Sequence, residues 1–158
     1  MNKKYLYTLP SVIYASTIFY LSSLSSPTIP SHKFFKYLYK FYLTLKSMGI
    51  EYIAYPFYVV YKYPDKFEHF ILYFGFGLTL YFAFKNLNKT KNYSYIFAIV
   101  AGVLYAALDE FHQSFVPLRS SSLFDLIADA VGIFFAQITV LLLINIKNFI
   151  SKSKGVEE

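Results

Sequence analysis

The sequence contains no cysteine and no tryptophan. The lack of cysteine excludes a disulfide framework and thiolate metal sites, and it leaves the redox compartment unspecified. Without tryptophan, aromatic anchoring at a membrane interface has to come from tyrosine, of which there are 17. Acidic residues are also few: 9 Asp and Glu stand against 15 Lys and Arg, for a formal net charge of +6. The positions of the basic residues therefore decide between a nucleic-acid and a membrane partner.

The chain is strongly apolar. Hydrophobic residues make up 56% of its 158 residues and aromatic residues 22%, whereas soluble domains are roughly 45–50% apolar. The length suits one domain. The basic residues flank apolar runs, which anionic lipid headgroups explain better than nucleic acid does. The sequence predicts a single membrane domain over residues 1–158, with no nucleic-acid partner.

Four apolar runs are long enough to predict membrane-spanning helices. The first is interpreted as a retained helix and not as a signal peptide, because no clear small-x-small cleavage site follows it. Gly75 and Gly77 predict close helix packing in the second. Ser122 and Asp125 predict a capping box at the start of the fourth. The predicted spans cover residues 6–24, 67–84, 93–115 and 123–146.

The loop over residues 27–64 has no run that could cross a membrane. Ser31 is placed to cap a helix with lysines on one side and aromatic residues and leucines on the other, and Gly49 is placed to end it. Such a helix lies in the membrane interface, as a simple anchor or as part of a substrate groove. The predicted fold is an all-α membrane protein, a four-transmembrane-helix bundle with an amphipathic interfacial segment between helices 1 and 2.

Charge is distributed unevenly along this topology. Four spans put both termini on one side, where short segments hold 8 of the 15 basic residues, so the positive-inside rule favours cytoplasmic termini in a bacterial plasma membrane. Most acidic residues fall at the opposite ends of the last three predicted spans. These are Asp65, Glu68, Asp109, Glu110, Asp125 and Asp129, of which Glu68 is expected to be solvated.

The polar residues at these outer ends share helix faces. Helical spacing groups Asp65, His69 and Tyr73, then Asp109, His112 and Gln113, then Asp125, Asp129 and Gly132. Asp129 lies about 10 Å inward of Ser122 along its helix. Because a charge at a helix centre in the bilayer costs about 2.5–3.5 kcal/mol, this cluster is predicted to be functional. Arg119 is placed to bind a carboxylate or a phosphate.

The ordered pattern of these residues resembles the VanZ-like family. The matching pieces are Asp65-Lys66-x-x-His69, Asp109-Glu110-x-x-Gln113, Pro117-x-Arg119 and Ser122-x-x-Asp125, with Gly132 deeper. Two positions depart from the pattern: Asp129 stands where Asn is usual, and Leu118 stands where Gly is usual. The resemblance implies a small multi-pass bacterial membrane protein whose namesake is associated with resistance to the glycopeptide teicoplanin. It implies no settled reaction and no cofactor.

Two chemistries suit the cluster. In the first, His69 and His112 supply nitrogen ligands and Asp109, Glu110 or Asp125 oxygen ligands to a divalent zinc or manganese ion. In the second, a histidine and a carboxylate act as acid and base on a lipid-linked phosphate. The candidate catalytic residues are His69, Asp109, Glu110 and Asp125. The candidate binding residues are Asp65, Lys66, Gln113, Arg119 and Asp129, with Arg119 and Lys66 clamping the phosphate.

Structural interpretations compete with these chemical ones. Asp125 can complete a helix cap, and Asp109 with Arg119, or Asp65 with Lys66, can lock helix ends together. The sequence therefore predicts an outward-facing polar pocket that binds or modifies an envelope lipid or a cell-wall precursor headgroup. The alternative is a non-enzymatic scaffold whose polar cluster locks helices or recruits a partner. Ion conduction is disfavoured, because the inner halves of the spans lack polar groups.

Overall fold

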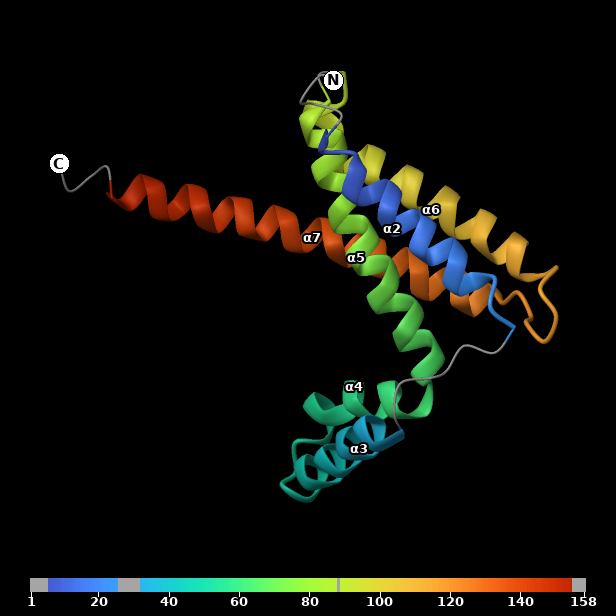
Figure 1. Cartoon of the computed structure of the whole chain (residues 1–158). Coiled ribbons are helices and arrows are strands. Elements are labelled where there is room, and N and C mark those ends of the chain that lie inside the picture. The colour runs from blue at the N-terminus through green and yellow to red at the C-terminus, as the bar shows by residue number, and fades with distance from the viewer. Residues whose placement is uncertain (1–5, 26–31, 88, 155–158) are drawn as a thin grey trace.

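The computed structural model describes residues 6–25, 32–87 and 89–154, and these are helical without any strand. The elements are α2 (Leu9–Ser22), α3 (His32–Ser47), α4 (Glu51–Lys62), α5 (Pro64–Asn86), η1 (Lys91–Tyr93), α6 (Ser94–Gln113) and α7 (Leu123–Lys154), arranged as in Figure 1. Three stretches are long and apolar enough to cross a membrane: Pro64–Asn86, Lys91–Gln113 and Leu123–Lys152. They correspond to the last three predicted spans. Because the described elements are all helices, the predicted all-α class is confirmed.

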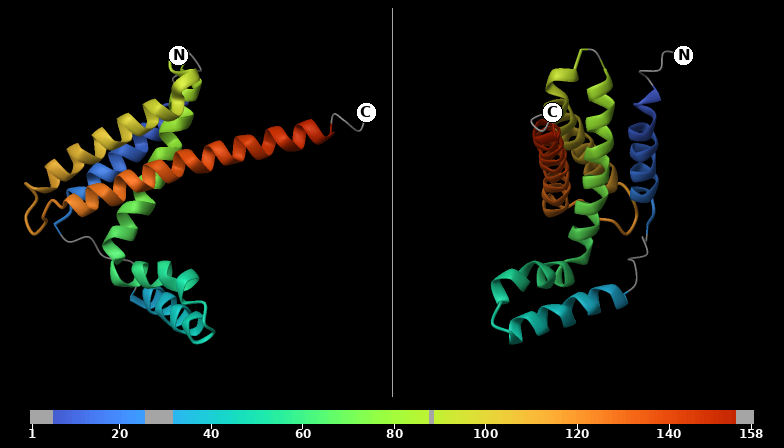
Figure 2. Two further views of the ribbon diagram at one scale, coloured as in Figure 1. Left: turned by 180° about the vertical axis from the view of Figure 1, so that it is seen from behind. Right: turned by 90° about the vertical axis from the view of Figure 1, so that its left-hand side faces the viewer.

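The first predicted span is a shorter helix. α2 has 14 residues, a length of about 21 Å, whereas a bilayer's hydrocarbon core is about 30 Å thick. Among the described residues there are thus three helical stretches of crossing length and one shorter apolar helix. α7 differs in the other direction, because it continues past the predicted end at residue 146 and extends well clear of the other helices (Figure 2).

Small residues let α5 and α7 approach closely. A Cβ atom at Gly132 would collide with the backbone of Phe70 and Phe74, and one at Gly77 would lie 2.9 Å from the Ala136 Cβ. Gln137 adds a polar tie, donating from Nε2 to the Gly77 carbonyl at 3.0 Å. Glycine at a membrane helix crossing favours such backbone contact. The close packing predicted from Gly77 is confirmed.

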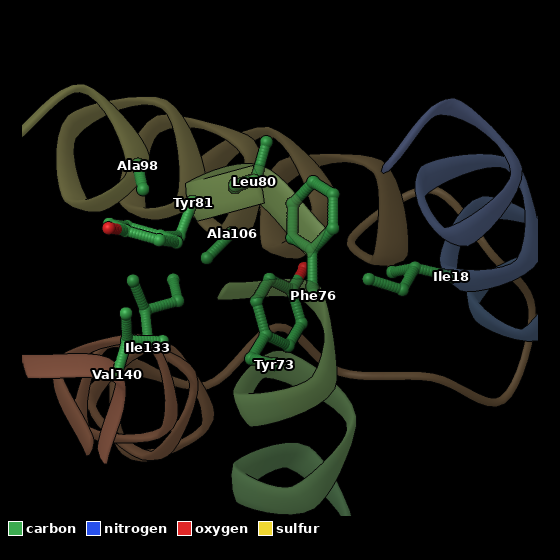
Figure 3. Close-up of a cluster of buried hydrophobic side chains, with 9 residues drawn as sticks. All are labelled: Ile18, Tyr73, Phe76, Leu80, Tyr81, Ala98, Ala106, Ile133 and Val140. Carbon is green, nitrogen blue, oxygen red and sulfur yellow. The ribbon is translucent and has the colours of Figure 1, made fainter. Parts of the chain in front are cut away.

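The apolar core joins four helices (Figure 3). Its buried members come from α2, α5, α6 and α7, and they are Ile18, Tyr73, Phe76, Leu80, Tyr81, Ala98, Ala106, Ile133 and Val140. α2 is held further by Tyr105, whose hydroxyl donates to the Ala15 carbonyl at 2.6 Å. The shorter helix is therefore an integral part of the bundle.

α3 and α4 form a separate hairpin beside the start of α5 (Figure 2). The aromatic face of α3 packs on α4, where the ring of Tyr42 contacts that of Tyr58. Phe35 and Tyr42 are both buried. α3 ends as predicted: Gly49 has a φ of 78°, and the Ile50 amide donates to the Leu45 carbonyl at 3.2 Å, which is a Schellman motif. The predicted cap, Ser31, lies outside the described residues. The amphipathic segment is therefore two helices, and it lies next to the polar cluster.

Candidate functional site

Lys66 connects the beginnings of α5 and α7. Its ammonium lies 2.9 Å from Asp65 Oδ2 and 2.5 Å from Asp125 Oδ1. The structural pair predicted between Asp65 and Lys66 is therefore present, with Asp125 as a second partner. A cation already shared by two carboxylates has less positive charge to offer a phosphate.

The start of α7 is capped from another helix. The Ser122 amide donates to Glu110 Oε2 at 2.7 Å, so the predicted carboxylate of the capping box, Asp125, is replaced by a residue of α6. Glu110 brings negative charge to the positive end of the α7 dipole. This arrangement frees Asp125 to bind Lys66, which explains why the local sequence motif is misleading here.

Deeper in the bundle, one imidazole meets two buried carboxyl groups. His69 Nδ1 lies 2.9 Å from Asp129 Oδ1, and Asp129 is 0% exposed. Donor atoms of His69, Glu110 and Asp129, from three helices, lie within 4.8 Å of one another. Within the described ranges, Asp129 Oδ2 and Glu110 Oε1 are buried without a hydrogen-bond partner. These are the side chains best placed to hold a metal ion.

Asp109 lies on the neighbouring side of the cluster. Its Oδ2 accepts hydrogen bonds from the Tyr73 hydroxyl and from Gln113 Nε2, both at 3.1 Å, while Oδ1 is buried and has no partner in the described parts of the chain. Tyr73 was expected on the face of His69 but not as a site residue. It belongs to the site because it holds Asp109 in place.

Arg119 binds the end of α2 and not Asp109. Its Nε donates to the Leu24 carbonyl at 3.1 Å and its Nη2 to the Leu21 carbonyl at 3.0 Å. Gln113 stands between the predicted partners, because its amide oxygen lies 3.4 Å from Arg119 Nη1 and its nitrogen donates to Asp109. A guanidinium at this position also complements the negative end of the α2 dipole.

The turn that carries Arg119 has an unusual backbone. Leu118 has a φ of 64°, in the left-handed region that favours glycine. This is the position at which the VanZ-like pattern usually has Gly. The departure seen in the sequence is therefore accommodated by a strained leucine, whose side chain is 88% exposed.

A pocket of about 480 Å³ opens between α2 and α5 beside these groups. Apolar residues that line it include Ile18, Phe35, Phe67 and Leu72, and polar residues that line it include His69, Asp109, Gln113 and Arg119. Two further lining residues, Ser22 and Glu68, were not predicted as site residues. Glu68, which was expected to be solvated, is half-buried: its Oε1 is buried and has no partner in the described structure, whereas its Oε2 is not among the buried unpartnered atoms.

His112 lies away from the other imidazole. Its ring stacks on Phe19 with 4.6 Å between ring centroids, and its Nε2 lies 3.1 Å from Ser23 Oγ. Among the described residues, the donor atoms close enough to share an ion belong to His69, Glu110 and Asp129, so the structure does not bring His112 into one ligand group with His69. Helical spacing put His112 near Asp109 but could not show that its ring turns toward α2.

Comparison with known proteins supports the resemblance seen in the sequence. The VanZ/LLP1 family model matches residues 7–144, which includes α2, all of the polar cluster and most of α7. Neither the curated proteins nor the solved structures give a significant match. Since the family match extends over most of the chain, this protein belongs to the VanZ/LLP1 family.

Proposed function

We propose that this membrane protein binds, or chemically modifies, the phosphate-bearing headgroup of an envelope lipid or a lipid-linked cell-wall precursor. The observation that carries this proposal is the pocket between α2 and α5, which is lined by both apolar and polar side chains. Its volume of about 480 Å³ is in the usual range for small-molecule sites, about 300–1,000 Å³. Such a pocket suits an amphiphile.

The apolar and the polar lining residues bind different parts of the ligand. The apolar chain lies against Ile18, Phe67 and Leu72, and the headgroup reaches Gln113 and Arg119. Arg119 is the only arginine in the sequence, and its planar fork suits a phosphate better than a lysine does. Lys66, tied to Asp65 and Asp125, orients the helix ends and contributes to binding through them.

The remaining cluster residues supply chemistry at the headgroup. In this proposal His69, Asp109, Glu110 and Asp125 act as acid, base or ligand groups, and Asp129 positions His69. Of these, His69 and Asp109 line the pocket and stand nearest to a bound headgroup. The association of the family's namesake with teicoplanin would then reflect a change in an envelope lipid or precursor at the outer leaflet.

The membrane topology completes the proposal. α2 serves as a fourth membrane helix, because it is apolar and buries Ile18 in the core shared with α5, α6 and α7. Both termini are then cytoplasmic in a bacterial plasma membrane, in keeping with their lysines. The hairpin of α3 and α4 lies in the outer interface, and the pocket opens outward.

A non-enzymatic scaffold is the second candidate function. It is favoured by the way in which cluster residues bind other helices: Lys66 reaches Asp125, and Arg119 reaches the Leu21 carbonyl. In this alternative the polar groups fix the helices so that a partner protein can bind. His69→Ala, Glu110→Gln and Arg119→Ala would then reduce teicoplanin resistance only in proportion to protein abundance.

Native mass spectrometry of the detergent-solubilised protein tests the lipid proposal. The probes are an anionic phospholipid, a zwitterionic phospholipid and a polyprenyl diphosphate, each at equal concentration. We expect one retained lipid per chain and at least about tenfold lower retention in Leu72→Trp, which fills the pocket. Leu104→Trp, on an exposed position of α6, is the matched control. Equal retention by both variants and the wild type contradicts the proposal.

A further inference from the structure

We propose that His69, Glu110 and Asp129 bind one divalent transition-metal cation, of the zinc or manganese class, where α5, α6 and α7 meet. This goes beyond the lipid-binding function and does not depend on it. The three side chains come from three different helices, and each offers one donor atom within 4.8 Å of the other two. Ligands of a single ion have to lie this close together.

The spacing of the first two ligands already suits a shared ion. His69 Nδ1 and Asp129 Oδ1 are 2.9 Å apart. Two neighbouring ligands, each about 2.1 Å from the metal, lie about 3.0 Å apart in an octahedral site, as for manganese, and about 3.4 Å apart in a tetrahedral site, as for zinc. The hydrogen bond between these atoms can therefore be exchanged for two bonds to a cation with little movement of the helices.

Unpartnered buried oxygens point to a missing positive group. Asp129 is 0% exposed and Glu110 6% exposed. Asp129 Oδ2 and Glu110 Oε1 both lack a hydrogen-bond partner among the residues that the structure describes. A buried polar atom without a partner costs about 1–3 kcal/mol, and more when it is charged. A divalent cation held by both oxygens of Asp129 and by Glu110 Oε1 would satisfy these atoms and neutralise both carboxylates.

The donor set limits the choice of ion. One imidazole nitrogen with carboxylate oxygens suits zinc or manganese, whereas thiolate-seeking ions find no ligand in a chain without cysteine. The other oxygen of Glu110 is fixed by the Ser122 amide, which orients the carboxylate as an outer hydrogen bond does in known metal sites. His69 also lines the pocket, so the ion would lie next to the pocket.

Metal binding to the full-length protein in detergent tests this site. A chelator first removes any bound metal from the protein, which is then titrated with Mn²⁺ or Zn²⁺ alone. Inductively coupled plasma mass spectrometry measures the amount of bound metal per chain. We expect one ion per chain in the wild type and at least about tenfold weaker binding in Asp129→Asn and Glu110→Gln. Electron–nuclear double-resonance spectra of the Mn²⁺ form should show a hyperfine coupling from an imidazole nitrogen, and this coupling should disappear in His69→Gln.

Two controls separate a built site from chance binding and from misfolding. Glu51→Gln, on the hairpin of α3 and α4, and Glu68→Gln, on α5, each remove a carboxylate outside the trio and should bind metal as the wild type does. The metal should raise the thermal midpoint of the wild type but not that of Asp129→Asn, since only a specific ligand of the native state stabilises it. Substoichiometric metal, or equal affinity in all five variants, overturns the proposal whatever the pocket binds.

Discussion

The Tyr73 hydroxyl donates a hydrogen bond to Asp109 Oδ2 across 3.1 Å, from α5 to α6, and both residues are buried. This bond links the apolar core of Figure 3, to which Tyr73 belongs, with the polar cluster next to it. The stability of the bundle and the geometry of the site therefore depend on the same side chain.

Tyr73→Phe should lower the free energy of unfolding by about 1–3 kcal/mol, because the carboxyl group of Asp109 loses a donor without gaining access to water. Chemical denaturation in detergent measures the loss. Tyr52→Phe, at a position 97% exposed, should change stability by less than about 0.5 kcal/mol. A double-mutant cycle with Asp109→Asn isolates the pair, and a coupling energy near zero would contradict this interpretation.

Leu118→Gly should stabilise the protein by about 1 kcal/mol. The left-handed backbone of a non-glycine residue costs roughly 1–2 kcal/mol. Glycine relieves this strain, but its greater conformational freedom in the unfolded chain offsets part of the gain in stability. The exposed leucine side chain gives up little packing. Thermal unfolding checks the sign, and Leu118→Ala, which keeps the strain, should show no such gain. A destabilised glycine variant would mean that the leucine side chain has a role of its own.

Gly132→Ala should be far more damaging than Gly102→Ala. At Gly132 the added carbon meets the rigid backbone of Phe70 and Phe74, whereas at Gly102 it meets the end of the Ile133 side chain, at 2.9 Å. Overpacking typically costs about 1–3 kcal/mol, and a clash with backbone belongs at the upper end or beyond. Folded yield and thermal midpoints of the two variants provide the comparison. Similar values for both would show that α5 and α7 can separate at small cost.

Arg119→Lys should weaken the attachment of α2 to the bundle. The planar guanidinium donates to the carbonyls of Leu21 and Leu24 from two different nitrogens, and an ammonium group lacks this geometry. Because the chain has no cysteine, spin labels at Tyr20→Cys and Ile71→Cys report the distance between α2 and α5 directly. We expect a broader distance distribution in Arg119→Lys and an unchanged one in Ser120→Ala. An unchanged distribution in both would show that core packing alone fixes α2.

Acid should weaken the hairpin of α3 and α4. A hydrogen bond from Lys46 at 2.9 Å holds the pKa of Glu51 below its ordinary value of about 4.3. A carboxylate whose pKa is lower in the folded state stabilises it above the unfolded pKa, and this contribution disappears as pH falls through the folded pKa. Carbon NMR of the Glu51 carboxyl group follows the titration. In Lys46→Met its midpoint should move up, whereas an unmoved midpoint would exclude the pair as the cause.

Much of the helical arrangement could be predicted because hydropathy and spacing act locally. Apolar runs marked the three long helices, and the positions of Asp65, Asp109 and Asp125 near helix ends predicted their convergence. The predictions for Gly49 and Gly77 are confirmed because both roles require a residue without a side chain. Gly49 adopts a left-handed turn, and Gly77 lies at a close helix crossing.

The missed features depend on contacts between distant segments. Glu110 replaces Asp125 at the start of α7 because α6 happens to bring it within 2.7 Å of the Ser122 amide. His112 turns to Phe19, and Arg119 to Leu24, through packing against α2. Gln137 is buried in the inner half of the predicted span 123–146, contrary to the expectation that the inner halves lack polar groups. It carried a detectable signal, because an amide at such depth needs a partner, here the Gly77 carbonyl.

The shortness of α2 has a consequence for the surrounding lipid. In the proposed topology this helix is about 9 Å shorter than the hydrocarbon layer around it. A bilayer responds to such hydrophobic mismatch by thinning locally. Lipid headgroups beside α2 would then lie closer to the membrane midplane than elsewhere, which shortens their path to Arg119 and the carboxylates behind it.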